Sequence, residues 1–96
     1  MNMNAMMRQA QQLQKKMMKE KEEIDAMNFE TTTSFLHIEM NGKKEVKKVK
    51  INIDKLEQDD IEMLEDLIQV AVNETIKKID KETENKMGKY TKGLPF

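Results

Sequence analysis

The chain has 96 residues, of which 38% are hydrophobic and 4% aromatic, and its formal net charge is −1. This length predicts one domain, and so few large apolar side chains predict a thin core that a partner subunit would help to complete. The sequence has no cysteine, no apolar run long enough for a transmembrane helix and no signal peptide, so it excludes disulfides and cysteine-based zinc sites and predicts a cytoplasmic protein.

Residues 3–27 are predicted to form one long helix. Its apolar side chains recur at alternating steps of three and four, which is the a/d heptad pattern of a coiled-coil-like seam. The stripe is interrupted only at Glu20 and consists of Met3, Met6, Ala10, Leu13, Met17, Ile24 and Met27. Methionine is a pliable side chain, so we expect an adaptable seam in which Met3 and Met6 are packed.

Residues 28–53 are predicted to form three antiparallel strands, at 28–34, 35–40 and 44–53. Apolar and polar residues alternate through the second and third of these segments, as in strands with one buried face. Between them, Asn41-Gly42 is the pair preferred in a two-residue hairpin turn, where both central residues have positive φ. Val46 and Val49 differ in parity, which predicts a bulge near Lys47-Lys48.

Residues 59–87 are predicted to form a second long helix. Asp59 and Glu62 have the spacing of a capping box, and a wide apolar face extends from Ile61 to Ile79. Gly88 is expected to stop this helix and to leave 89–96 as a flexible tail. The order helix, three strands, helix defines an α+β domain over residues 1–88, and the free ends of both helices are expected on the same side of the sheet.

Several segments in this order resemble one family of small proteins. They are MMRQAQQLQKKM at 6–17, Gly42 with Val46, Val49 and Ile51, DDIEMLEDLI at 59–68 with Ala71 and Asn73, and GKYTKGLP at 88–95. Together they resemble the YbaB/EbfC family of bacterial nucleoid-associated proteins. The resemblance implies a tweezer-like homodimer with helical arms that binds DNA and acts in nucleoid organisation or gene regulation. The chain departs from the family pattern at 31–34, where a Gly-rich link is usual, and at 52–54, where Asp-Pro often occurs.

Basic side chains near the free ends of the two helices are the candidate contacts to double-stranded DNA. They are Arg8, Lys15, Lys16 and Lys19 on the first helix, and Lys81, Lys86, Lys89 and Lys92 on the second helix and tail. Lysine is a flexible point charge suited to phosphates, which carry little sequence information, so broad specificity is expected. The structural alternative is that these side chains only solvate helix faces and pair with neighbouring glutamates.

Apolar positions on the strands and the second helix are the candidate core and dimer contacts. They are Leu36, Ile38, Met40, Val49, Ile51, Leu64 and Ile68. The second helix alone covers one face of the sheet, and the apolar surface left over is of the kind that marks an interface. We therefore expect a homodimer.

A second function class is a prefoldin-like chaperone or protein-interaction module that uses the Met-rich end of the first helix. Enzyme activity is the least supported class, because one histidine, one serine and no cysteine offer no nucleophile system. Helix capping explains the acids at 59–66 more simply than a Mg²⁺ site does. We expect no catalytic residue, cofactor, metal, membrane or small-molecule substrate.

The segment from Asn41 to Asn73 combines a basic strand with an acidic helix start. Its lysines at 43–50 lie close in sequence to acids that would repel phosphate. The segment is therefore interpreted as the core of the fold and of the dimer, and the DNA contacts are placed at the ends of the helical arms.

Overall fold

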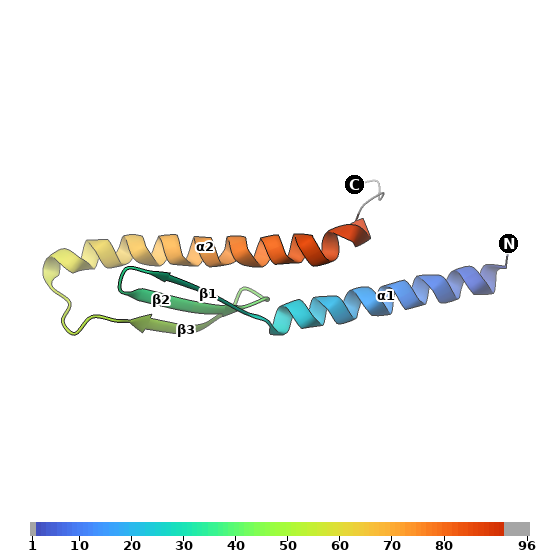
Figure 1. Cartoon of the computed structure of the whole chain (residues 1–96), viewed down its shortest axis with the longest axis horizontal. Coiled ribbons are helices and arrows are strands. Elements are labelled where there is room, and N and C mark those ends of the chain that lie inside the picture. Colours follow the sequence, from blue (N-terminus) through green and yellow to red (C-terminus); the bar gives the residue numbers. More distant parts are fainter. Residues whose placement is uncertain (1, 92–96) are drawn as a thin grey trace.

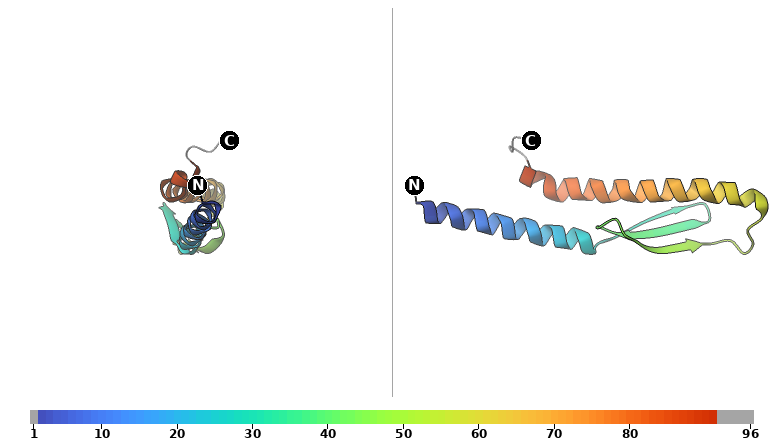
Figure 2. Two further views of the ribbon diagram at one scale, coloured as in Figure 1. Left: turned by 90° about the vertical axis from the view of Figure 1, so that its right-hand side faces the viewer. Right: turned by 180° about the vertical axis from the view of Figure 1, so that it is seen from behind.

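The computed structural model describes residues 2–91, which form an elongated α+β unit with extents of 71 × 23 × 14 Å. Helix α2 runs along one face of a three-stranded sheet and α1 projects from one end of it, so that the free ends of both helices lie beyond the same end of the sheet, as predicted (Figures 1 and 2). The elements are α1 (Met3–Ala26), β1 (Asn28–Thr33), β2 (Leu36–Asn41), β3 (Val46–Ile51) and α2 (Gln58–Thr91). The predicted order of elements and the α+β class are confirmed.

Helix α1 begins and ends with local hydrogen bonds. The side-chain oxygen of Asn2 accepts the N–H of Asn4 at 3.0 Å, so Asn2 caps the helix. At the other end Met27 adopts extended backbone, and its N–H donates to the carbonyl of Ile24 at 3.0 Å. The chain thus passes directly from α1 into β1.

The apolar stripe of α1 lies mostly on the surface. Ile24, in the last turn, is buried, whereas Met3 is 75% exposed and Met6 and Leu13 are about half exposed. The N-terminal part of α1 extends beyond the end of α2 (Figure 1). The expectation that Met3 and Met6 are packed is therefore wrong for residues 2–91 of the single chain, because no other element in that range covers them.

The three strands form an antiparallel sheet in the order β1-β2-β3. Strands β1 and β2 are joined by the two residues Ser34 and Phe35, with Ser34 at φ 51°. A serine accepts this left-handed backbone less readily than glycine does, and no sequence pattern marked the turn.

The connection from β2 to β3 differs from the predicted two-residue turn. The N–H of Asn41 donates to the carbonyl of Glu45 at 3.1 Å and closes a three-residue loop of Gly42, Lys43 and Lys44. Within this loop the N–H of Lys44 donates to the Asn41 carbonyl at 3.1 Å, and Lys44 has the positive φ of 66°. Such a loop is a tight turn followed by a left-handed residue that forms a β-bulge. It is among the commonest hairpin connections after the two-residue turns. The side-chain oxygen of Asn41 favours it by accepting the N–H groups of Lys43 and Glu45 at 2.9 and 3.1 Å.

The predicted bulge near Lys47-Lys48 is confirmed. Glu39 pairs with Lys48 but Met40 pairs with Val46, so Lys47 is the extra residue. The shift brings Val46 to the same sheet face as Val49, where both pair with buried residues of β2.

The core lies between this face of the sheet and α2. Leu36, Ile38 and Met40 of β2 are at most 2% exposed, and Ala71 and Ile79 of α2 pack over them. The buried hydroxyl of Thr75 is also paired, since it donates to the Ala71 carbonyl at 2.7 Å and lies 2.8 Å from the hydroxyl of Thr31.

Helix α2 covers β1 and β2 but leaves β3 open. On one flank, Lys78 donates to the carbonyl of Glu30 in β1 at 2.5 Å. On the other flank, Asp80 pairs with Lys44 in the loop before β3 at 2.9 Å. Every residue of β3 is exposed.

Both ends of α2 differ from the prediction. The helix begins at Gln58, which places Asp59 inside the first turn, and the capping bond runs from the N–H of Glu57 to the carboxylate of Asp60 at 2.9 Å. This capping bond joins Glu57 and Asp60, two residues earlier than the predicted Asp59/Glu62 pair, so the predicted capping box is wrong. At the other end the helix passes through Gly88 to Thr91, so the predicted stop is wrong. Residues 92–96 of the predicted tail lie outside the described residues.

Candidate nucleic-acid interface

Three cations form a stripe on the projecting helix α1. Arg8, Lys15 and Lys19 are separated by seven and four residues, spacings that return to one face of a helix. All three are exposed, and within residues 2–91 none of them has an acidic partner. The helical period of 3.6 residues puts this cationic stripe opposite the stripe of Met3, Met6 and their heptad partners.

Lys16 and Lys89 do not belong to the cationic stripe, and both lie near Glu20. The ammonium of Lys89 lies 3.1 Å from Oε1 of Glu20 and joins α2 to α1. This hydrogen bond, with help from Tyr90 and Lys16, holds the pKa of the Glu20 carboxyl below its usual value. Burial of the Tyr90 ring beside Glu20 raises the pKa of its hydroxyl. Lys89 is thus engaged in holding the two helices together.

The remaining candidates on α2 are also uneven. Lys81 is exposed and has no acidic partner among the described residues, whereas Lys86 lies 3.8 Å from Glu82 in the preceding turn. Lys92 lies outside the described residues. The structure thus gathers Arg8, Lys15 and Lys19 on one face, and it brings Lys89 and Lys86 to carboxylates instead.

The lysines of the β2–β3 loop lie at the base of the arms. Lys43 and Lys44 adjoin the end of α1 and the middle of α2, and the acidic start of α2 is at the opposite end of the sheet (Figure 1). For these two lysines, the argument that the acidic helix start repels phosphate is therefore wrong. It fails because antiparallel pairing carries the loop away from residues close to it in sequence.

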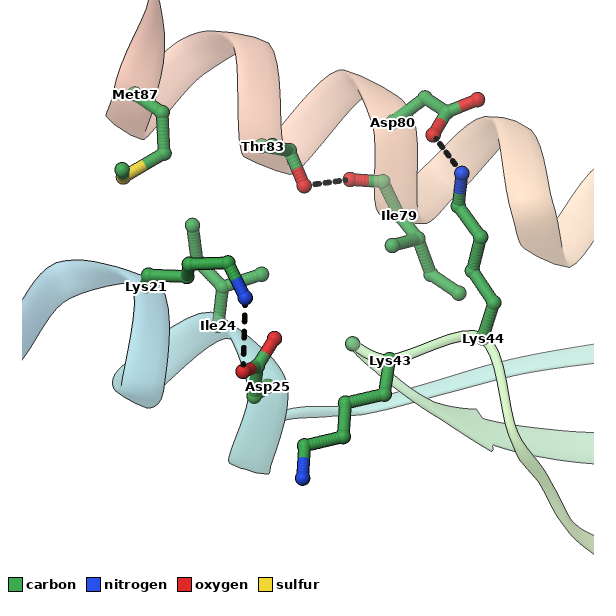
Figure 3. A pocket seen from close by; sticks show the side chains of 10 residues that line it. Lys21, Ile24, Asp25, Lys43, Lys44, Ile79, Asp80, Thr83 and Met87 are labelled. Atoms are coloured by element: carbon green, nitrogen blue, oxygen red, sulfur yellow. Dashed lines mark hydrogen bonds and ion pairs between the residues drawn. The ribbon is translucent and has the colours of Figure 1, made fainter. Parts of the chain in front are cut away.

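A cavity of about 470 Å³ lies at this arm base, between α1, the β2–β3 loop and α2 (Figure 3). Ile24, Ile79 and Met87 supply apolar wall. Four of the charged side chains around it form two ion pairs, Lys21 with Asp25 at 3.4 Å and Lys44 with Asp80 at 2.9 Å, and Lys43 also lines the cavity. Such paired charges do not form a catalytic constellation.

The candidate core and dimer residues divide into two groups. Leu36, Ile38 and Met40 are buried within the chain, and Leu64 is partly buried against them. Val49 is 54% exposed, and Ile51 and Ile68 are 44% and 42% exposed. The second group belongs to a surface of the single chain.

One group of metal-ligand side chains was missed by the sequence reasoning. Among residues 2–91, Glu30, His37 and Glu39 bring a nitrogen and two carboxylate oxygens within 4.8 Å of one another. Alternation along β2 did place His37 and Glu39 on one face. Glu30 joins them only through the β1–β2 register, and the turn that sets that register had no sequence signal.

Neither helix within residues 2–91 has a stretch that is both long and apolar enough to cross a membrane. Fold and site together define a small α+β protein with a cationic helical arm beside a half-covered sheet. The sequence pattern of the YbaB/EbfC DNA-binding family matches residues 1–94, and the chain therefore belongs to this family.

Proteins of very similar length share much of this sequence. A protein from Lactococcus lactis subsp. cremoris (strain MG1363) that is named a nucleoid-associated protein is 43% identical to this chain, and the match covers 100% of this chain and 99% of the relative's own length. Another so named, from Clostridium botulinum (strain Alaska E43 / Type E3), is 45% identical over 98% of this chain and 85% of its own. A third, from Enterococcus faecalis (strain ATCC 700802 / V583), is 41% identical over 98% and 92%. The family is one of DNA-binding proteins rather than of enzymes.

Proposed function

We propose that this protein binds duplex DNA as a homodimer, mainly through backbone phosphates, and acts in nucleoid organisation or gene regulation. The observation that carries the proposal is the stripe of Arg8, Lys15 and Lys19 on an exposed helix of a DNA-binding family member. Phosphate contacts from such side chains give affinity with little sequence discrimination. The names of the relatives support a location at the nucleoid.

The homodimer is supported by the open side of the sheet. Val46, Val49 and Ile51 of β3 are each about half exposed on the face that elsewhere forms the core. Ile61 and Ile68 of α2 are similarly exposed, although they lie 18 and 11 residues before the buried Ile79, spacings that return to the same face of the helix. A contiguous apolar surface of this kind on a chain with so small a core marks an interface. A second copy would cover it and complete the core.

The DNA contacts are tested by measuring affinity against salt concentration with unrelated duplexes. Neutralising about four to eight phosphates per dimer predicts that log K falls with log salt at a slope of about −4 to −7. The triple variant Arg8→Gln, Lys15→Gln, Lys19→Gln should bind all duplexes more weakly and with a flatter slope. The matched control removes equal charge away from the stripe, at Lys50, Lys55 and Lys77, and should keep most of the slope. Equal losses in the two variants, or no binding at low salt, would refute the assignment.

The dimer is tested by sedimentation equilibrium at micromolar concentration. Val49→Asp places a charge in the proposed interface, which costs about 3 kcal/mol or more, a loss of over a hundredfold in dimer affinity. Val70→Asp is the matched control, because Val70 is 48% exposed on the side of α2 turned away from the sheet. A wild-type monomer, or equal effects of both substitutions, would contradict the proposed surface.

The Met-rich end of α1 supports a second candidate function, a protein-binding or chaperone-like role. Met3, Met6 and Met7 are between 49% and 75% exposed, and flexible methionine surfaces suit varied apolar partners. Suppression of client aggregation in the absence of salt-sensitive DNA binding would favour this role over the first.

A further inference from the structure

The outer face of the sheet, turned away from α2, carries two glutamates in direct opposition. Glu30 of β1 pairs with Glu39 of β2. Like charges at directly opposed positions destabilise a sheet unless a cation lies between them. His37 lies beside this pair, with Nε2 at 3.0 Å from Oε2 of Glu39 and 3.7 Å from Oε2 of Glu30.

Neighbouring side chains orient these groups toward one point. The hydroxyl of Thr32, directly across the sheet from His37, lies 2.6 Å from its Nδ1 and fixes the ring with Nε2 toward the carboxylates. The side-chain amide of Asn28 donates to Oε1 of Glu39 at 3.1 Å, which leaves Oε2 to face His37. The hydrogen bond from His37, followed by that from Asn28, holds the pKa of Glu39 below its usual value. Glu39 therefore presents a negatively charged oxygen at neutral pH.

The separations match the edges of a metal coordination polyhedron. Tetrahedral zinc with bonds of about 2.0–2.1 Å holds its ligand atoms about 3.3–3.4 Å apart. The two distances from Nε2, 3.0 and 3.7 Å, lie on either side of this value, and all three ligand atoms are within 4.8 Å of one another. Small side-chain rotations would equalise them, since Glu30 is 59% exposed and free to adjust.

We propose that Glu30, His37 and Glu39 form a binding site for a divalent transition-metal ion of the zinc type on the outer face of the sheet. The ion binds Nε2 of the neutral ring, whose single proton then lies on Nδ1, where the Thr32 hydroxyl accepts it; if the free ring is doubly protonated, its Nε2 proton is released to solvent. Imidazole with carboxylate is a ligand set that suits zinc, and a second partner that orients a ligating histidine is the usual support of such sites. The fourth position is left to water. The site is separate from the arm and its DNA contacts.

One cation already competes for this position. The ammonium of Lys48, across from Glu39 on β3, lies 3.9 Å from Oε2 of Glu39. Lys50 is the cross-strand neighbour of His37. Removing the charge of Lys48 should therefore tighten metal binding, an effect opposite in sign to that of removing a ligand.

The test is calorimetric titration of the untagged full chain with Zn²⁺ at neutral pH, with Mg²⁺ as the hard-cation comparison. We expect one Zn²⁺ per chain and no binding of Mg²⁺, which prefers octahedral oxygen ligands. His37→Gln and Glu39→Gln should abolish binding, Glu30→Gln should weaken it, and Thr32→Val should cost on the order of tenfold in affinity. Lys48→Gln should bind more tightly than wild type. Glu62→Gln removes an exposed carboxylate on α2 and should change nothing.

Because His37 is the single histidine of the chain, its imidazole signals in an NMR spectrum report on the site in the wild-type protein, independently of any variant. Loss or shift of these signals with one equivalent of Zn²⁺ supports the site. Retention of wild-type affinity in His37→Gln, binding of one Zn²⁺ per two chains, or unchanged imidazole signals at saturating Zn²⁺ would each overturn it. Circular dichroism of each variant shows whether it is folded before its affinity is compared.

Discussion

The substitution Gly42→Ala should separate the hairpin from the base of the α1 arm. The N–H of Gly42 donates to the carbonyl of Asp25 at 3.2 Å, in the last turn of α1. A Cβ at position 42 would overlap the carbonyl of Ile24 and would lie 2.9 Å from the Cα of Asp25. These obstacles are backbone atoms, so they cannot rotate away as the end of a side chain can.

The cost follows from overlap and from the hydrogen bond. Forcing one methyl group into a packed site costs about 1–3 kcal/mol, and the lost hydrogen bond costs about 1 kcal/mol. The lower entropy of alanine in the unfolded chain returns about 0.4–1 kcal/mol. We expect a net loss of about 1–3.6 kcal/mol, which for a domain of this size lowers the melting temperature by roughly 4–29 °C.

The assay is thermal unfolding followed by circular dichroism, with all variants at the same protein concentration because a dimer's stability depends on it. Gly88→Ala is the matched control. Among the described residues, the nearest atom to its Cβ would be a carboxylate oxygen of Glu84 at 3.1 Å, the end of a flexible side chain. Within α2 it should raise stability by up to about 1 kcal/mol. If Gly42→Ala melted at or above the wild-type temperature, the close approach of hairpin and arm would be refuted.

Three further predictions concern the core and the ion pairs. Ile38→Ala, at a position 2% exposed, should cost about 2–5 kcal/mol in urea unfolding, and a loss below 1 kcal/mol would contradict its place in the core. Thr75→Val removes the acceptor of the Thr31 hydroxyl and should lower the free energy of unfolding by about 1 kcal/mol. Thr75→Ser keeps the hydroxyl and its hydrogen bonds, so it should lower the free energy of unfolding by less. Equal losses of the two variants in urea unfolding would argue against the hydroxyl pair. The pKa values of Glu20 and Glu39 are lowered in the folded chain, so their stabilisation is present above the ordinary value of 4.5 and is lost as pH falls below it. Melting temperatures between pH 7 and pH 3 should therefore fall less steeply in the double variant Glu20→Gln, Glu39→Gln than in wild type, and parallel curves would exclude this contribution.

The arrangement of the strands could be predicted because each signal was local and agreed with its neighbours. The alternation of Leu36, Ile38 and Met40 with polar residues fixed the buried face of β2. The change of parity between Val46 and Val49 required a bulge, and the pairing of β2 with β3 places it at Lys47. The long apolar face of α2 likewise predicted the helix that covers the sheet.

The turns and the helix ends could not be predicted, because contacts distant in sequence decide them. Asn41-Gly42 favours a two-residue turn by itself, but Gly42 is instead held against Asp25 at the end of α1. Gly88 is a good stop by itself, but the helix continues, and the next residue, Lys89, is held by Glu20 of α1 at 3.1 Å. The cost of about 1 kcal/mol for a glycine inside a helix is small enough for such a contact to offset.

The candidate site depended on which side chains were already paired, and charge runs in the sequence do not contain this information. Eight candidate cations were equivalent by position, but Lys89 and Lys86 face Glu20 and Glu82, at 3.1 and 3.8 Å. The helical spacing of Arg8, Lys15 and Lys19 was visible in the sequence. Their lack of acidic partners in the described chain became visible only when α1 was seen to project beyond α2.

The separation of charge along the molecule explains how a chain of net charge −1 can present a basic arm. The acids at the start of α2 lie at the end of the sheet away from α1, on a molecule 71 Å long (Figure 1). Charges more than a screening length of about 8–10 Å apart hardly influence each other at physiological salt. A phosphate near Arg8 or Lys15 is therefore attracted by the local stripe and is not repelled by Asp59 or Asp60 of the same chain. For this fold, net charge carries little information about nucleic-acid binding, and the face and free length of α1 carry more.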